Sequence, residues 1–330
     1  MKDFIGIVKD KVSLSKLALI AKPNTLSLHL AVLRTTSHTP SSPPNDHHLA
    51  TLLSLGDSSR ATASILIHSL MNRLHRTTDS YVALKCLFTI HHIIKRGPFI
   101  LKDQLSAFPA GGGRNNLNLS GFRDGSSATT WVLSAWVRWY ARYLETVIFT
   151  SKNLGFVICS SPSQFEDSIS SYMNHDLIRD FESLVSLIEE ICKAPDNLLV
   201  ERDRLLHVIT DMLMNDYLST VNEILLRLSE FKERVSLLSF NDSVELVSSL
   251  DRLLSCKEKL SHLFSIRKTS VETLWELIEE LNNKIGMVNL QKLGKRPSGS
   301  ESARFDDRAV RTSDSMKFSS GRLNLNWSNV

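Results

Sequence analysis

The stretch "DSYVALKCLFTIHHIIKRGPF", residues 79–99, carries a strong helix signal and decides the fold class. An Asp-Ser pair stands where a helix N-cap is preferred, and basic residues followed by Gly97 and Pro98 mark the helix end. Between these signals the apolar residues recur at helical spacing, at Val82, Leu84, Leu87, Ile90 and Ile94. They cover much of the circumference, so we predict that this helix lies in the middle of a bundle.

The same period extends outward from this helix. In "SRATASILIHSLMNRLHR", residues 59–76, apolar residues lie three and four apart on one face. After a Gly- and Asn-rich loop at 106–127 comes the aromatic stretch "ATTWVLSAWVRWYARYLETVIF", residues 128–149. There a stripe repeats every four residues, at Trp131, Ala135, Trp139 and Tyr143. We expect this stripe to pack in the core.

Further helical patterns fill the second half of the chain, and no segment alternates with period two. These patterns cover 176–192, 198–214, 216–238, 242–264 and 270–285. Short breaks between them carry the capping residues Asp196 and Asn241, as antiparallel helix hairpins require. The helix pairs have unequal lengths, so the predicted fold is all-α, an irregular superhelical solenoid of antiparallel helices.

Composition limits the classes of protein that fit. A net charge of +4 on 330 residues excludes the strongly basic profile of a protein that coats nucleic acid, but permits a local basic patch for phosphates. The four cysteines lie far apart without a CxxC pair, which indicates reduced thiols in a cytosolic protein. Lysines interrupt the N-terminal segment, and no apolar run reaches about eighteen residues, so we expect neither a secretory signal nor a membrane span.

Signatures of catalysis and of metal binding are missing from the sequence. "GGGR" at 111–114 lacks the Lys-Ser/Thr pair that completes a phosphate-binding loop. His91 and His92 are adjacent, so on a helix they project about 100° apart and cannot hold one metal ion together. Neither HExxH nor GxSxG occurs. We predict that the protein is not an enzyme and holds no cofactor or metal.

The stretch "AVLRTTSHTPSSPPNDHHLATLL", residues 31–53, is a candidate anion site. A helical pattern at 24–33 ends at several prolines, and a new helix begins with Asp46 as the expected N-cap. The first turn of that helix offers free N–H groups that favour an anion. The candidate headgroup-binding residues around it are Arg34, His38, His47 and His48. A polar surface loop with solvated histidines is the other interpretation, and these residues alone leave both open.

Three blocks in this order resemble the ANTH domain of the clathrin assembly adaptors, especially its plant members. They are "AVLRTTSH" (31–38), "YVALKCLFTIHHIIKRGPFIL" (81–101) and "FRDGSSATTWVLSAWVRWYARYLE" (122–145). The resemblance covers about residues 1–290 and implies an ANTH-like helical domain. Its lipid-binding N-terminal part would span about 1–155 and its helical extension about 165–290. Residues 291–330, rich in Ser, Arg, Asp and Gly, are predicted to form a disordered tail.

The resemblance also implies a function. Such a protein would be a peripheral membrane endocytic adaptor that binds phosphatidylinositol 4,5-bisphosphate and links the membrane to clathrin-coat assembly, with a VAMP-type R-SNARE as cargo. It would act on the cytoplasmic face of membranes, in clathrin-coated pits and vesicles at the plasma membrane or the Golgi, without binding nucleic acid. Arg34 falls on the headgroup-binding lysine of the family and His38 on its histidine, and Asn45 and His47 stand where lysines are frequent.

Departures from the family pattern weaken this expectation. Asn45, Asp46 and His47 lower the positive charge, and each basic residue near anionic lipid contributes about 1 kcal/mol, so binding should be about tenfold to a hundredfold weaker. We expect weak phosphoinositide binding that strengthens as the histidines gain protons below about pH 6.5. The alternative is a helical protein–protein scaffold with a weakened or lost lipid site. The tail contains no clathrin box and no DPF or NPF, which argues against direct clathrin binding.

The N-terminal segment forms an amphipathic helical pattern in which Phe4, Ile5, Val8 and Val12 share one face. This face could insert at a membrane interface or pack on the second helix. The resemblance favours packing on the second helix.

Overall fold

The computed structural model describes residues 2–20, 23–107, 117–158, 169–195, 203–264 and 269–294. Within these ranges the chain forms helices and no β-strand, so the predicted all-α fold is confirmed. In chain order the helices are α1 (Lys2–Ile20), α2 (Pro23–Thr35), α3 (Asp46–Gly56), α4 (Arg60–Arg76), α5 (Ser80–Arg96), α6 (Phe99–Ala107), α7 (Ala128–Leu154), α9 (Asn174–Cys192), α10 (Arg204–Arg234), the 3₁₀ turn η3 (Val235–Leu237), α11 (Phe240–Ser255), α12 (Lys257–Leu263) and α13 (Thr269–Gly294). Of the predicted tail, residues 295–330 lie outside the described residues.

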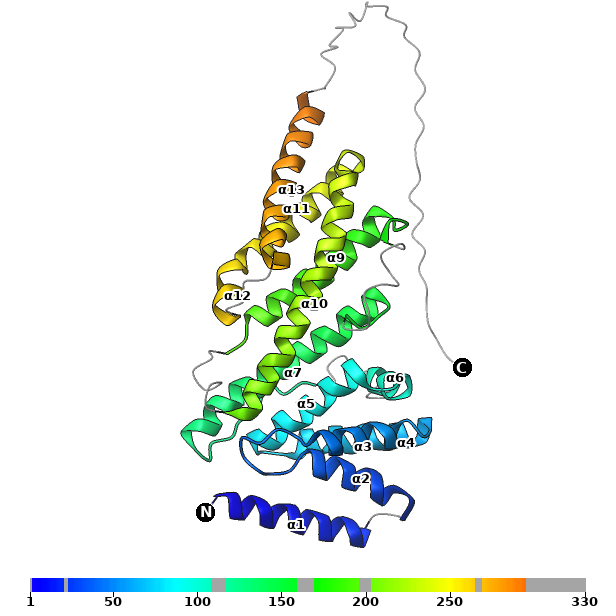
Figure 1. The fold of residues 1–330 in the computed structure, drawn as a ribbon, viewed down its shortest axis with the longest axis vertical. Coiled ribbons are helices and arrows are strands. Elements are labelled where there is room, and N and C mark those ends of the chain that lie inside the picture. Colours follow the sequence, from blue (N-terminus) through cyan, green and yellow to red (C-terminus); the bar gives the residue numbers. More distant parts are fainter. Residues whose placement is uncertain are drawn as a thin grey trace, which may run out of the picture.

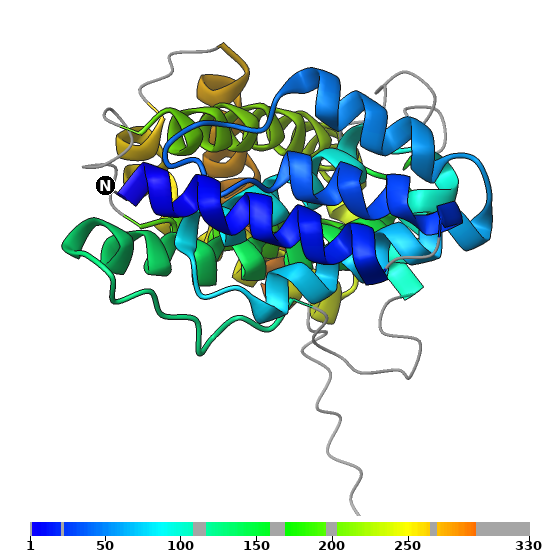
Figure 2. The ribbon, with the colours of Figure 1, turned by 90° about the horizontal axis from the view of Figure 1, so that it is seen from below.

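The helices stack along the long axis of the molecule, with α1 at one end and α13 at the other (Figure 1). Successive layers contact each other: α2 packs on α1 and α3, α5 on α4 and α7, α9 on α7 and α10, and α13 on α10 and α11. Seen from below, α1 lies across the end of this stack (Figure 2). None of the described helices is long and apolar enough to cross a bilayer.

Helix α5 lies in the middle of the N-terminal layers, as its sequence predicts. The Asp79 side chain caps it by accepting hydrogen bonds from the backbone N–H groups of Tyr81 and Val82. Most of its residues are buried, polar ones included. At the other end Gly97 follows the last turn so closely that a Cβ would lie 2.4 Å from the Ile93 carbonyl oxygen. A side chain at this position would therefore clash, so the end of α5 requires glycine.

The aromatic stripe of α7 is only partly in the core. Trp139 and Tyr143 are buried, and Trp139 donates its ring N–H to the Glu190 carbonyl oxygen of α9 at 2.8 Å. Trp131, however, is 57% exposed, so the expectation that the whole stripe packs in the core is wrong at its first member. The first turn of α7 contacts the start of α5 through Thr130, whose carbonyl oxygen accepts a hydrogen bond from the Ser80 hydroxyl at 3.1 Å, and the neighbouring Trp131 is left exposed.

Several predicted helix boundaries differ from those observed. The patterns at 198–214 and 216–238 belong to one helix, α10, because Asp216 is held inside it by buried hydrogen bonds rather than exposed at a break. The pattern at 242–264 is divided at Cys256 into α11 and α12. Ser239, and not Asn241, caps α11 through a capping box with Asp242. Asp196 lies outside the described residues.

Candidate functional site

The candidate site is the corner where α2 ends and α3 begins. The Thr35 and Thr36 hydroxyls donate to carbonyl oxygens of the last turn of α2, and an irregular turn then runs to α3. Asn45 caps α3: its backbone is extended and its side-chain oxygen accepts the His47 N–H at 2.8 Å. The prediction that Asp46 is the cap is therefore wrong. Asp46 is the first helical residue, where a carboxylate is also favourable.

Two hollows flank the Arg34 side chain. A hollow of about 320 Å³ lies between α1, α2 and the turn, and its lining includes Asp10, Leu14, Arg34, Ser37, Pro43, Asn45 and His48. A second hollow of about 310 Å³ lies between α2 and α3, and its lining includes Ser27, Leu30, Arg34, His47, His48, Thr51 and Leu55. Arg34 and His48 line both. The fold thus brings together three of the predicted site residues, Arg34, His47 and His48.

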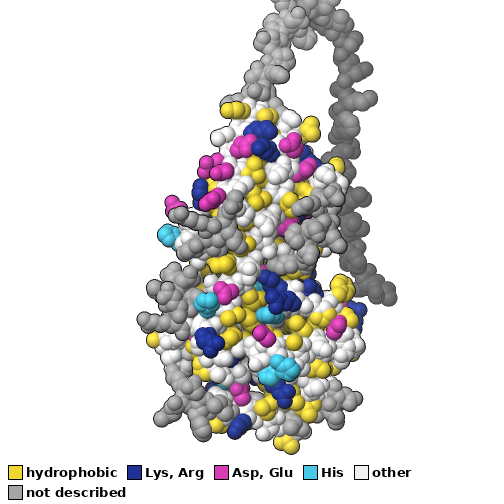
Figure 3. All heavy atoms as spheres, viewed as in Figure 1, with side chains coloured by type: hydrophobic (Ala, Val, Ile, Leu, Met, Phe, Trp, Pro, Cys, Tyr) yellow, Lys and Arg dark blue, Asp and Glu magenta, His cyan; other side chains and the backbone are white. Residues whose placement is uncertain are grey.

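Arg34 and His47 are exposed, and His48 is half-buried. The described residues place no hydrogen-bond or ion-pair partner on the Arg34 guanidinium, so its donors remain open to an anion. On the face drawn in Figure 3, acidic and basic side chains lie together on the upper part, and basic, histidine and single acidic side chains lie among apolar ones lower down. A phosphate at this corner would meet Arg34, the two histidines and the N-terminal end of α3.

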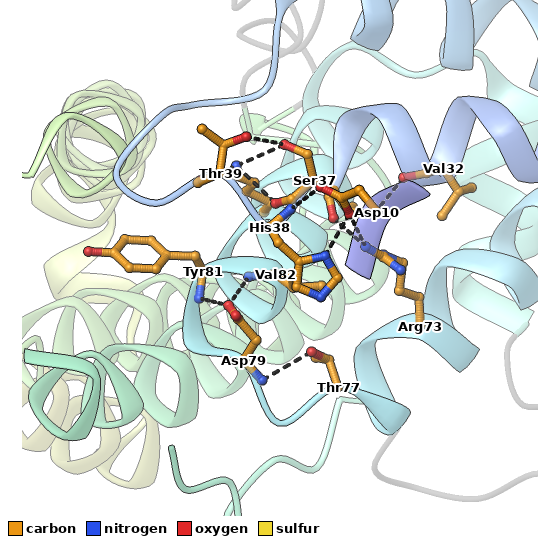
Figure 4. A network of polar contacts seen from close by, with 12 residues as sticks. Asp10, Val32, Ser37, His38, Thr39, Arg73, Thr77, Asp79, Tyr81 and Val82 are labelled. Carbon is orange, nitrogen blue, oxygen red and sulfur yellow. Dashed lines mark hydrogen bonds and ion pairs between the residues drawn. The ribbon is translucent and has the colours of Figure 1, made fainter. Parts of the chain in front are cut away.

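His38 lies apart from this group. Its ring Nδ1 is 2.6 Å from Asp10 Oδ1 in α1, and its backbone N–H donates to Asp10 Oδ2 at 2.9 Å. Arg73 of α4 approaches the same carboxylate at 3.8 Å, and both side chains point at Asp10 (Figure 4). Burial on its own raises the pKa of Asp10, but His38 and Arg73 outweigh it and hold that pKa below its ordinary value. His38 therefore attaches α1 to the turn.

The contact between Asp10 and His38 determines which face of α1 is exposed to solvent. A Cβ on Gly6 would lie 3.1 Å from the His38 Cβ, so the Gly6–Asp10 face packs tightly on the turn. Val8 and Val12 lie on the outer side and are 43% and 46% exposed. The expectation that they pack on the second helix is wrong, because Asp10 finds its ion-pair partners on the inner side. The side chains of Phe4 and Ile5 lie outside the described residues.

Sequence reasoning missed Lys85, a buried lysine of α5 that supports this corner. Its Nζ donates to the Ser37 carbonyl oxygen at 3.0 Å, to the Ser37 hydroxyl at 3.2 Å and to the Thr39 carbonyl oxygen at 2.7 Å. The signal that could have revealed it is a charged residue in the middle of the most apolar helical stretch, where a lysine needs buried acceptors.

Fold and corner together define a class: all-helical superhelical domains in which an arginine and two histidines meet where two helices join, near one end. The ANTH domain family matches residues 27–273, and the chain belongs to this family. The Arabidopsis thaliana protein named "Putative clathrin assembly protein At4g40080" is 48% identical over 341 residues, which cover 97% of this chain and 93% of that protein. "Putative clathrin assembly protein At5g10410" of the same plant is 33% identical over 305 residues, covering 88% and 87%.

Proposed function

We propose that this protein is a peripheral adaptor of clathrin-mediated endocytosis that binds phosphatidylinositol 4,5-bisphosphate at the α2–α3 corner. The observation that carries the lipid site is Arg34, which lies between two hollows at the N-terminal end of α3 without an internal partner among the described residues. Membership of the ANTH family and the names of the relatives support the role in clathrin assembly. Arg34, His47 and His48 contact the headgroup, and His38 acts through the turn.

The remaining parts of the proposal concern partners and place. The adaptor acts on the cytoplasmic face of the plasma membrane or the Golgi, in clathrin-coated pits and vesicles. Residues 1–155 bind the lipid and the extension, 165–290, presents a surface for a VAMP-type R-SNARE. Leu237 and Phe240 support such a surface, because they are 74% and 64% exposed at one end of the extension.

Arg34→Ala tests the lipid site. We expect the protein to sediment with vesicles containing phosphatidylinositol 4,5-bisphosphate, and the variant to bind them about tenfold more weakly, because it loses the fixed cation of the corner. Co-sedimentation with and without the lipid measures this, and Arg60→Ala serves as a control, because Arg60 is an exposed arginine at the start of α4. Equal binding of wild type and Arg34→Ala would contradict the proposed site.

The histidines make the proposed binding sensitive to acid. Lipid binding should be stronger at pH 6 than at pH 7.5, because histidine is the side-chain type whose charge ordinarily changes in this range. The double variant His47→Gln with His48→Gln should remove most of this difference. The phosphomonoesters of the headgroup also gain protons near about pH 6 and oppose this effect, so the wild type is compared with the double variant on the same vesicles. Equal pH dependences of the two would show that the histidines do not contribute.

A second candidate function is a helical protein–protein scaffold without a membrane role. The exposed Asp46 favours it, because its carboxylate at the corner opposes a phosphate, and Asn45 brings no charge. The vesicle experiment separates the two candidates: a scaffold would not sediment with any lipid mixture between pH 6 and 7.5.

A further inference from the structure

Lys85 is a buried cation without a buried anion beside it. The residue is 1% exposed, and the described residues place no carboxylate oxygen within ion-pair distance of its Nζ. All three hydrogen bonds of the ammonium group go instead to the turn, at Ser37 and Thr39. An ammonium group has three donors, so Lys85 has none left for water or for a ligand.

The turn that Lys85 holds connects the two halves of the corner. It joins Arg34, at the end of α2, to the capped start of α3. Ser37, which accepts two of the three bonds, also lines the larger hollow. The turn has no regular secondary structure, so side chains from other helices fix its path. Arg73 donates to the Thr36 carbonyl oxygen at 2.6 Å and Asp10 accepts from the His38 N–H, whereas Lys85 donates to two residues of the turn, Ser37 and Thr39.

We propose that Lys85 is a positioning residue for anion binding: it holds the 37–39 turn so that Arg34 and the start of α3 face the same phosphate. The inference rests on the proposed function of the corner. Stability alone does not account for a lysine here, because an apolar side chain of similar length avoids the cost of burying a charge. What an apolar side chain cannot supply is the set of donors that orders the turn before the ligand arrives.

The pH dependence of Lys85 separates positioning from stability. Burial lowers its pKa to about 8, and Arg73 on α4 adds to the decrease. Three carboxylates raise this pKa: Asp10 on α1, Asp79 just before α5 and Asp203 just before α10. As the pH rises from 8 to 10.5, the folded protein loses this proton while the unfolded chain retains it, so this group makes the fold more stable. The neutral amine, however, has two donors for three acceptors, so the turn should loosen.

The test compares wild type with Lys85→Met on vesicles of phosphatidylcholine with phosphatidylinositol 4,5-bisphosphate, at pH 7.2 and pH 9.0. We expect the variant to bind about tenfold more weakly at pH 7.2, because about one residue of the turn would then have to be ordered on binding. We expect wild-type affinity to fall about threefold or more by pH 9.0, and the affinity of the variant to stay level. The headgroup cannot cause this fall, because phosphomonoesters lose their last proton near about pH 6.

Lys152→Met is the matched control, since Lys152 is an exposed lysine of α7 that donates to one carbonyl oxygen, that of Ser106, at 3.2 Å. It should bind and titrate like wild type. Equal binding by Lys85→Met and wild type at pH 7.2 would overturn the inference. Equal wild-type affinity at pH 7.2 and pH 9.0 would overturn it too, and this second result does not require that Lys85→Met folds. Absence of binding by wild type at pH 7.2 would instead overturn the proposed function.

Discussion

Replacing Asp216 by alanine is expected to lower the free energy of unfolding by about 3–5 kcal/mol, because it removes the anion from a buried polar cluster. Asp216 of α10 accepts a hydrogen bond from the Tyr143 hydroxyl of α7 at 2.5 Å and lies 2.7 Å from His91 Nε2 of α5. Lys95 of α5 donates to its other oxygen. The cluster joins α5, α7 and α10. Without the carboxylate, the Tyr143 hydroxyl, the His91 ring and the Lys95 ammonium group each lose this hydrogen-bond partner.

The pH dependence of this effect has a definite sign. Burial on its own raises the pKa of Asp216, but His91 and Lys95 outweigh it and hold the pKa well below its ordinary value of 3.8. The stabilisation is therefore complete above about pH 4 to 5 and is lost as the pH falls toward the lower folded pKa. Urea unfolding at pH 7 and pH 3 should give a smaller difference between wild type and Asp216→Ala at pH 3.

Asp211→Ala is the matched control for this substitution. Asp211 is on the same helix, but its side chain is 56% exposed and pairs with the exposed His207, at 3.1 Å. Its removal should change the free energy of unfolding by less than about 0.5 kcal/mol. If Asp216→Ala cost no more than Asp211→Ala, the cluster would not stabilise the contact of α10 with α5 and α7.

The fold could be predicted because its signals are local. The caps and the apolar period of 79–99 identify α5 without knowledge of any neighbour, and α5 is buried as that period predicts. The continuity of α10 could not be predicted in this way. The polar Asp216 resembles a break in the sequence, and only the partners that α5 and α7 bring to it explain why it lies inside a helix.

The candidate site could be predicted only in part, for the same reason. Arg34, His47 and His48 lie near each other along the chain, at two helix ends, and the fold brings them together. His38 and Lys85 depend on distant partners: Asp10 of α1 turns His38 inward, and the turn after α2 satisfies Lys85. A sequence pattern cannot tell a histidine that faces a ligand from one that holds a helix in place.

The charge that this corner lacks can be restored, and we expect the restoration to strengthen lipid binding. Asp46→Asn combined with His47→Lys adds about two positive charges at neutral pH. At about 1 kcal/mol for each, affinity for vesicles with phosphatidylinositol 4,5-bisphosphate should rise about thirtyfold. Asn45 is left unchanged, because its side chain caps α3 and loss of a cap costs about 1 kcal/mol of stability.

The first turn of α9 offers a control of similar composition, because it carries His175 and Asp176, in the reverse order of Asp46 and His47 in α3. This turn lies near Arg234 at the end of α10, far along the stack from α1 (Figure 1). Asp176→Asn with His175→Lys gives the same net charge, yet we expect it to change vesicle affinity less than about threefold, because exposed charges beyond a Debye length of about 8–10 Å are largely screened. Equal gains from both double variants would mean that net charge, and not the α2–α3 corner, governs membrane binding. A gain confined to the α3 variant would locate the headgroup at the corner, because both variants add charge at a helix N-terminus but the α3 variant adds it beside Arg34.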